Sequence, residues 1–232
     1  MMPQGSFEPV AIEDIYMPEN HNQVHVAVNV MRARQTVIGF NIAIVSFQIT
    51  QLYRITGGIR VPGFDHQIHV TAELALFMSL ALSLIALIAM TMSSLMDEVG
   101  VCTHWSLLVG DLLMYLALAY TLSGFFAPLA ESMRVFTENL PGQGTQAIIV
   151  QDAVLVMAGV AWCMAMYVAP LVSLVRSPFS RLTNLSAGAA YLVLLLVLAW
   201  INAQGLMIES ENFGDPTVFT AVLSELMQPL RW

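Results

Sequence analysis

Long apolar stretches separated by short polar connections dominate the pattern along this chain. A membrane-spanning helix needs about 20 mostly apolar residues. Four stretches meet that need: Val70–Met96, Trp105–Ala130, Ala153–Val175 and Leu185–Ile208. The alternating polar and apolar positions that mark the strands of a membrane β-barrel are missing from the sequence. The pattern therefore predicts an all-α integral membrane protein.

A fifth stretch, Thr36–Tyr53, is shorter and carries three amide side chains. We expect it to span the membrane too, and the alternative is that it lies in the interface. The predicted fold is a bundle of five transmembrane helices, residues 36–208, with spans at about 36–53, 70–96, 105–130, 153–175 and 185–208. The longest connection, Glu131–Gln151, is too short to hold a second domain.

The two ends of the chain differ in character from the spans. Residues 1–35 are predicted to be a polar, partly helical segment, and residues 209–232 an acidic tail. In the tail, Asp215 and Pro216 are predicted to start an amphipathic C-terminal helix as its N-cap and first residue. Its apolar face comprises Val218, Phe219, Val222, Leu223, Leu226 and Met227. Because its polar face has no basic residue, we expect this helix to dock on protein rather than on anionic lipid.

Composition narrows the possible chemistry. With 57% hydrophobic and 10% charged residues and a mean hydropathy of +0.72, the chain has too few polar residues to cover a water-soluble core. It has no lysine, which excludes Schiff-base chemistry of the retinal and pyridoxal kind. Cys102 and Cys163 have no cysteine nearby in sequence, which disfavours thiol redox and iron–sulfur sites. A net charge of −8 argues against nucleic acid as a partner.

The N-terminal segment bears on where the protein resides. The first 35 residues contain no apolar run of the kind found in cleaved signal peptides. We therefore expect the first span to direct insertion, giving a multi-pass protein of a cell inner or plasma membrane. Four arginines fall on each side of the predicted bundle, so their number does not decide the orientation. Those on the side of the N-terminus, Arg32, Arg34, Arg176 and Arg181, lie closer to span ends than Arg54, Arg60, Arg134 and Arg231, which favours a cytoplasmic N-terminus.

Small residues recur at helical spacing in three spans, where they let helices approach closely in lipid. They are Ala72, Ala75, Ser79, Ser83, Ala86 and Ser93 in the second span, Gly110, Ala117, Thr121 and Gly124 in the third, and Ala158, Ala161, Ala165 and Ala169 in the fourth. One interpretation is a tight monomeric bundle. We favour the other, a homo-oligomer, because five helices offer few interior faces for three such stripes.

The first span carries a polar stripe. Arg34, Asn41 and Gln48 are seven residues apart, and Gln51 lies one turn further on the same helix face. Amides in hydrocarbon are unfavourable unless they are hydrogen-bonded, so this face is predicted to point at protein or water. Two interpretations remain open: a buried hydrogen-bonded seam between helices, or the lining of a pore or cavity.

The start of the second span gathers ionisable side chains. His66, His69 and Glu73 fall on one helical face, with Asp65 beside them. This set suits a divalent metal ion, and a histidine near a carboxylate also suits proton sensing. The ordinary interpretation is that Asp65 caps the helix, the histidines lie at the headgroup level and Glu73 pairs with an arginine.

Asp111 is the most deeply embedded charge, about 10 Å into the third span. An intramembrane carboxylate is a candidate functional site, and His104 lies seven residues earlier on the same face. The alternative is a hydrogen-bonded aspartate that faces Asn41 or a serine of the second span. No two spans carry histidines at matching depth, so we expect no haem and no other cofactor.

These features favour a homo-oligomeric membrane protein that forms an ion (cation or proton) or small-solute pathway. Its predicted lining residues are Asn41, Gln48, Gln51, Glu73 and Asp111. The alternative is a non-catalytic structural or accessory subunit of a larger membrane complex. Hydrolase and metalloprotease motifs are missing from the sequence, so we do not expect an enzyme or catalytic residues. The expected partners are the lipid bilayer, further copies of the chain and other membrane subunits.

Overall fold

The computed structural model describes residues 24–25, 28–52, 54, 58–59, 63, 67–96, 101–102, 104–138, 144–209, 217–230 and 232. The helices are α1 Val28–Leu52, α2 Val70–Met96, α3 Ser106–Glu138, α4 Gly144–Cys163, a π-helical turn η1 Met164–Val168, α5 Ala169–Arg176, α6 Arg181–Glu209, α7 Val218–Leu226 and a 3-10 turn η3 Gln228–Leu230. Two short strands, β1 Val24–His25 and β2 Val101–Cys102, pair antiparallel. The prediction of an all-helical chain is confirmed apart from this pairing.

Four helices of the described part are long and apolar enough to cross a membrane: Val70–Leu95, Ser106–Thr137, Thr145–Arg176 and Arg181–Glu209. They correspond to the four apolar stretches of the sequence. α1 is 25 residues long but is not among them. Its polar stripe lowers its average hydropathy, although its outer side is apolar.

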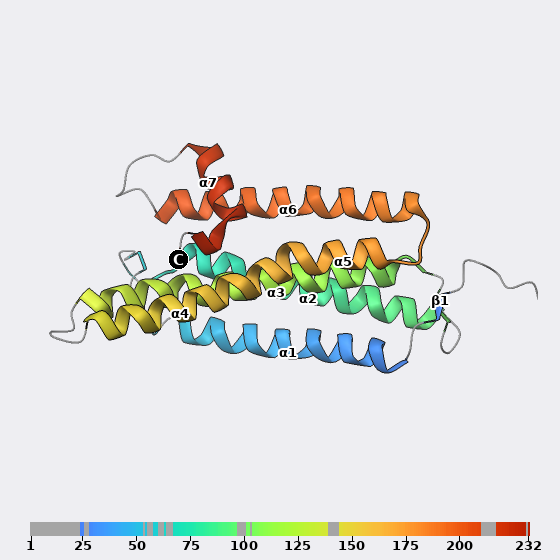
Figure 1. Cartoon of the computed structure of the whole chain (residues 1–232), viewed down its shortest axis with the longest axis horizontal. Helices are drawn as coiled ribbons and strands as arrows, with labels where there is room; N and C mark the ends of the chain where they lie inside the picture. Colours follow the sequence, from blue (N-terminus) through green and yellow to red (C-terminus); the bar gives the residue numbers. More distant parts are fainter. Residues whose placement is uncertain are drawn as a thin grey trace, which may run out of the picture.

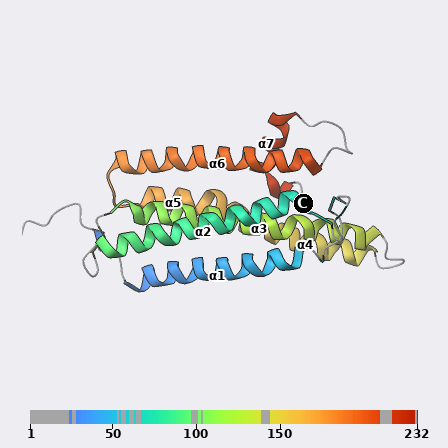
Figure 2. The same cartoon turned by 180° about the vertical axis from the view of Figure 1, so that it is seen from behind.

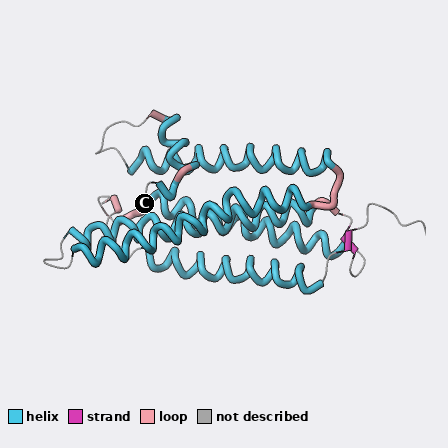
Figure 3. Tube along the Cα trace, viewed as in Figure 1, coloured by secondary structure: helices cyan, strands magenta, loops and turns pink. Residues whose placement is uncertain are grey.

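The long helices lie side by side along one axis (Figures 1 and 3). α2 and α3 form the middle of the bundle, with α1 on one side and α6 on the other (Figure 2). The ends of α3 and α4 that meet at the 139–143 connection extend beyond the other helices. The buried core lies mainly between α2 and α3.

The small residues of α2 and α3 lie in contacts between helices of this chain. Ala75, Ser79 and Ala86 of α2 are each at most 1% exposed. A Cβ atom on Gly110 would lie 2.8 Å from Met90 Cγ, and one on Gly124 would lie 2.6 Å from Leu76 Cγ, so both glycines allow the close approach of α2 and α3. These two stripes therefore leave no small-residue face for a second copy. In the fourth-span stripe, by contrast, Ala161 is exposed.

Pro170 explains the π-helical turn between α4 and α5. Proline has no N–H to donate to the carbonyl four residues earlier, which here is that of Met166. The backbone hydrogen bonds here join residues five apart instead of four, with the Ala169 N–H donating to the Met164 carbonyl. The Met166 carbonyl instead accepts from the Tyr191 hydroxyl of α6 at 2.6 Å. The freed backbone acceptor thus ties α6 to the fourth span.

Two predicted boundaries are wrong. The predicted connection Glu131–Gln151 is mostly helical, because α3 runs to Glu138 and α4 begins at Gly144. Glu131 pairs with Arg134 one turn along α3 at 2.7 Å, and Thr137 donates to Gln151 Oε1 of α4 at 3.0 Å. Between Ala130 and Pro141 the sequence has no glycine or proline, so the helix continues past its apolar part.

The tail helix also differs from its prediction. Thr217 is the N-cap of α7, and its side chain accepts from the Thr220 N–H at 3.3 Å; the predicted start at Asp215 and Pro216 lies outside the described residues. The buried side chains of α7 and η3 are those of Ala221, Glu225 and Gln228. Most of the large apolar side chains are exposed, with Phe219 76% and Leu230 83% exposed, whereas Leu226 packs against the core. The helix therefore packs on this chain through the side that carries Ala221 and Glu225, and the expectation that it docks on protein stays a prediction for its exposed apolar side chains.

Candidate functional site

Asn41 is the centre of a hydrogen-bonded cluster where α1, α2 and α3 meet. Its Nδ2 donates to Ser79 Oγ at 3.1 Å and to Ser83 Oγ at 2.9 Å. Its Oδ1 accepts from Thr121 Oγ1 at 2.8 Å. We call Asn41, Ser79, Ser83 and Thr121 the polar seam.

The polar seam is dry and internally bonded. Asn41 is 3% exposed, and the two serines are fully buried. Ser79 also donates to the Ala117 carbonyl of α3 at 2.8 Å. The single hydroxyl proton of Thr121 is shared between Asn41 Oδ1 and the same carbonyl, which is 3.0 Å away. Both amide donors of Asn41 and its oxygen are therefore occupied, so this part of the stripe joins helices rather than facing an open space.

Asp111 forms an ion pair with Arg34, which lies two turns before Asn41 on α1. Arg34 Nη2 of α1 lies 2.9 Å from Asp111 Oδ2 of α3, with the arginine side chain 26% and the aspartate side chain 6% exposed. The second carboxylate oxygen, Oδ1, is buried without a hydrogen bond. The polar partner of Asp111 in the structure is therefore Arg34, rather than Asn41 or a serine of the second span as in the alternative interpretation.

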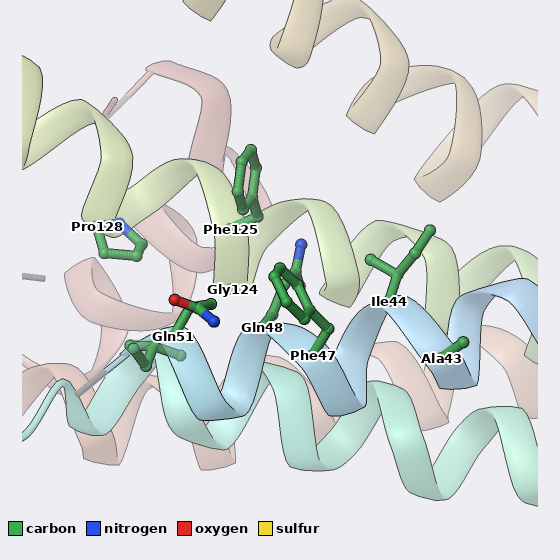
Figure 4. A pocket seen from close by; sticks show the side chains of 9 residues that line it. Ala43, Ile44, Phe47, Gln48, Gln51, Gly124, Phe125 and Pro128 are labelled. Carbon is green, nitrogen blue, oxygen red and sulfur yellow. The ribbon is translucent and has the colours of Figure 1, made fainter. Parts of the chain in front are cut away.

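At its other end the stripe meets a cleft between α1 and α3. The cleft has a volume of about 360 Å³ and is lined by Ala43, Ile44, Phe47, Gln48, Gln51, Leu52, Gly124, Phe125 and Pro128. Gln48 and Gln51 extend from α1 toward α3 (Figure 4). Gln48 Oε1 is buried and has no hydrogen-bond partner. Unlike Asn41, Gln48 therefore has a buried amide oxygen that no described residue of the chain bonds.

The ionisable group predicted at the start of the second span is only partly described. Asp65 and His66 lie outside the described residues. His69 is buried, and its carbonyl accepts from the Glu73 N–H at 2.8 Å in the first turn of α2. Within the described residues, histidine, cysteine, aspartate and glutamate form no group of three suited to a metal ion. The metal and proton-sensing interpretations remain predictions.

Glu73 and Asp111 lie near opposite ends of the bundle. Gly110, beside Asp111, packs against Met90 near the end of α2, whereas Glu73 is in its first turn. The two positions on α2 are roughly 25 Å apart along the helix. These carboxylates are therefore not parts of one local site.

Sequence reasoning missed a second buried polar cluster. The side-chain amides of Asn202 on α6 and Gln228 on η3 both donate to Glu225 Oε2 of α7. All three side chains are at most 6% exposed. The available signals were an asparagine inside an otherwise apolar span and a glutamate on an amphipathic helix. This cluster explains why α7 turns its polar face toward α6.

Comparison with known protein families, with curated proteins and with solved structures finds no match to this chain.

Proposed function

We propose that this chain is a five-span membrane protein and a non-catalytic structural or accessory subunit of a larger membrane complex. α1 supplies the fifth span. At 25 residues it is roughly 37 Å long, enough to cross a hydrocarbon core of about 30 Å. Phe40, 66% exposed, lies on its outer side, as expected for a helix in contact with lipid.

The observation that carries the structural role is the bonding of the α1 stripe. A conducting protein needs polar groups turned to a water-filled space. Here the Asn41 amide is bonded to α2 and α3, and Asp111 is paired with Arg34. These contacts support a role in fixing α1 to the bundle.

The first test is the composition of the purified protein. We expect the chain, extracted from its native membrane in a mild detergent, to co-purify with other membrane proteins in fixed stoichiometry. Size-exclusion chromatography with mass spectrometry of the peak measures this. A symmetric assembly of this chain alone would contradict the proposal and favour a homo-oligomeric pathway.

That pathway for a cation, proton or small solute is the second candidate. The length of the polar stripe favours it, because Arg34 and Gln51 are roughly 25 Å apart along α1, nearly the thickness of the hydrocarbon core. The open cleft beside Gln48 and Gln51 also favours a pathway.

A flux assay separates the two candidates. In liposomes, we expect the purified chain to conduct no more than protein-free liposomes do, because the seam is closed by its own bonds. Flux above that level, lowered by Asp111→Asn or Glu73→Gln, would instead support a pathway. Flux that neither substitution changes would remove both carboxylates from it.

A further inference from the structure

A second cleft, with a volume of about 630 Å³, lies between the fourth span and the C-terminal residues. Pro229 of η3 and Trp232 form one wall. The other wall follows one face of α4 and the start of η1, from Asp152 to Met164, which supplies seven of the nine lining residues. This face is roughly 18 Å long. We call the elongated cleft the α4 groove.

The two ends of the α4 groove lie at different depths of the bundle. Near its inner end, Trp162 donates to Ser123 of α3, which is level with the first two turns of α2 because the next residue of α3 packs against them. Near its outer end, Gln151 accepts from Thr137, roughly 20 Å further along α3. Asp152 therefore lies roughly 10 Å beyond the start of α2, where α3 and α4 extend past the other helices (Figures 1 and 2).

The chemistry of the lining changes along the same direction. Asp152, at the outer end, is the only lining residue with a carboxylate or a basic side chain. It is exposed and forms no ion pair or hydrogen bond with a described residue. Further in, the wall is apolar, with Val156 66% and Val160 60% exposed. The groove thus has an anionic end outside the apolar layer and an apolar floor inside it.

These two properties define the occupant. Apolar side chains at this depth favour hydrocarbon, whereas a carboxylate without a cation favours a positive charge. A lipid with a cationic headgroup meets both needs at once. A headgroup with only a negative charge would instead be repelled by Asp152.

The size of the groove also favours a lipid over a helix of another subunit. A helix of the same length, about 10 Å across, would occupy roughly 1,400 Å³, more than twice the volume of the groove. An extended hydrocarbon chain is much narrower, since non-bonded carbon atoms approach to about 4 Å.

We infer that the α4 groove binds a phospholipid whose headgroup ends in a primary ammonium group, the chemistry of phosphatidylethanolamine. The ammonium donates to the Asp152 carboxylate, and an acyl chain lies along Val156 and Val160 toward Cys163. Hydrogen bonds between charged groups are stronger than those between neutral groups. This inference rests on the proposed insertion in a membrane but not on the structural role, so failure of one leaves the other standing.

Lipids with the same acyl chains and different headgroups test the ammonium contact. We expect the full chain to bind phosphatidylethanolamine about three- to five-fold more tightly than phosphatidylcholine, whose methylated ammonium has no N–H to donate. Phosphatidylglycerol, which has no cation, is expected to bind more weakly than both. Native mass spectrometry of the delipidated chain in a mild detergent gives the three dissociation constants.

Paired variants locate the headgroup. Asp152→Asn is expected to abolish the preference for phosphatidylethanolamine over phosphatidylcholine. The control is Glu131→Gln, which removes an exposed carboxylate from α3 outside the groove and is expected to keep the preference.

A second pair locates the acyl chain. Val160→Trp fills the groove and is expected to weaken all three lipids at least five-fold. Val193→Trp places the same side chain on α6, at a position that is 61% exposed and outside the groove, and is expected to change none of the constants.

Three binding results would overturn the inference: equal affinity for the three lipids, a preference for phosphatidylethanolamine that persists in Asp152→Asn, or a Val160→Trp variant that binds lipid like Val193→Trp. Cys163, exposed at the groove, tests for a second copy of the chain. In a Cys102→Ser background under a mild oxidant we expect no disulfide between chains. Efficient cross-linking through Cys163 would replace the lipid by another copy.

Discussion

Arg34→Met is expected to lower the free energy of unfolding by about 3 kcal/mol, because it leaves Asp111 buried without its cation. The carboxylate is held among the helices, and its Oδ1 already lacks a hydrogen bond. Methionine keeps much of the arginine stem, so the loss reports the charge rather than the packing. Reversible unfolding in mixed micelles measures the difference.

The matched control is the other ion pair of the described residues. Arg134 and Glu131 are 2.7 Å apart, but their side chains are 61% and 41% exposed. Arg134→Met is therefore expected to change stability by no more than about 1 kcal/mol. The double variant Arg34→Met with Asp111→Leu should recover most of the loss, since it removes both buried charges. A double variant as unstable as Arg34→Met alone would show that the pair is not the cause.

The positions of the apolar helices could be predicted because their signal is local. α2 begins and ends at Val70 and Met96, as predicted, since a long apolar run bounded by polar residues determines a span by itself. The ends of α3 and α4 could not be predicted in this way. Beyond the apolar run their helical state depends on contacts such as that of Thr137 with Gln151.

The polar stripe could be assigned to one face of α1, but its partners could not. Heptad spacing places Arg34, Asn41 and Gln48 on one line, whatever lies opposite. Which side chain each one meets depends on how far α1, α2 and α3 are shifted along their common axis. That shift brings Arg34 to Asp111 and leaves Gln48 beside a cleft.

The orientation of α7 could not be predicted for a related reason. Periodicity identifies the apolar face of a helix but not the medium that this face meets. In the structure Glu225 is buried and Phe219 is exposed. The bond of Glu225 to Asn202 of α6 holds the helix in this orientation.

Asn41→Ala is expected to lower the free energy of unfolding by about 2–4 kcal/mol. Three hydrogen bonds between helices disappear, each contributing about 0.6 kcal/mol and at most about 1.7 within a membrane bundle. A small cavity in a buried site adds to this loss. Ser79 and Thr121 keep their bonds to the Ala117 carbonyl, so the damage is confined to the attachment of α1.

Thr36→Ala is the control for this attachment, because the Thr36 hydroxyl is exposed and bonds only the Arg32 carbonyl of its own helix. We expect it to change stability by less than about 0.5 kcal/mol. Asn41→Leu keeps the number and branching of the side-chain heavy atoms and still breaks the seam, so it should be nearly as unstable as Asn41→Ala. If Asn41→Leu unfolded like the unaltered chain, apolar packing alone would hold α1 in place. The polar seam would then have no structural role, and the argument for a scaffolding subunit would lose its main support.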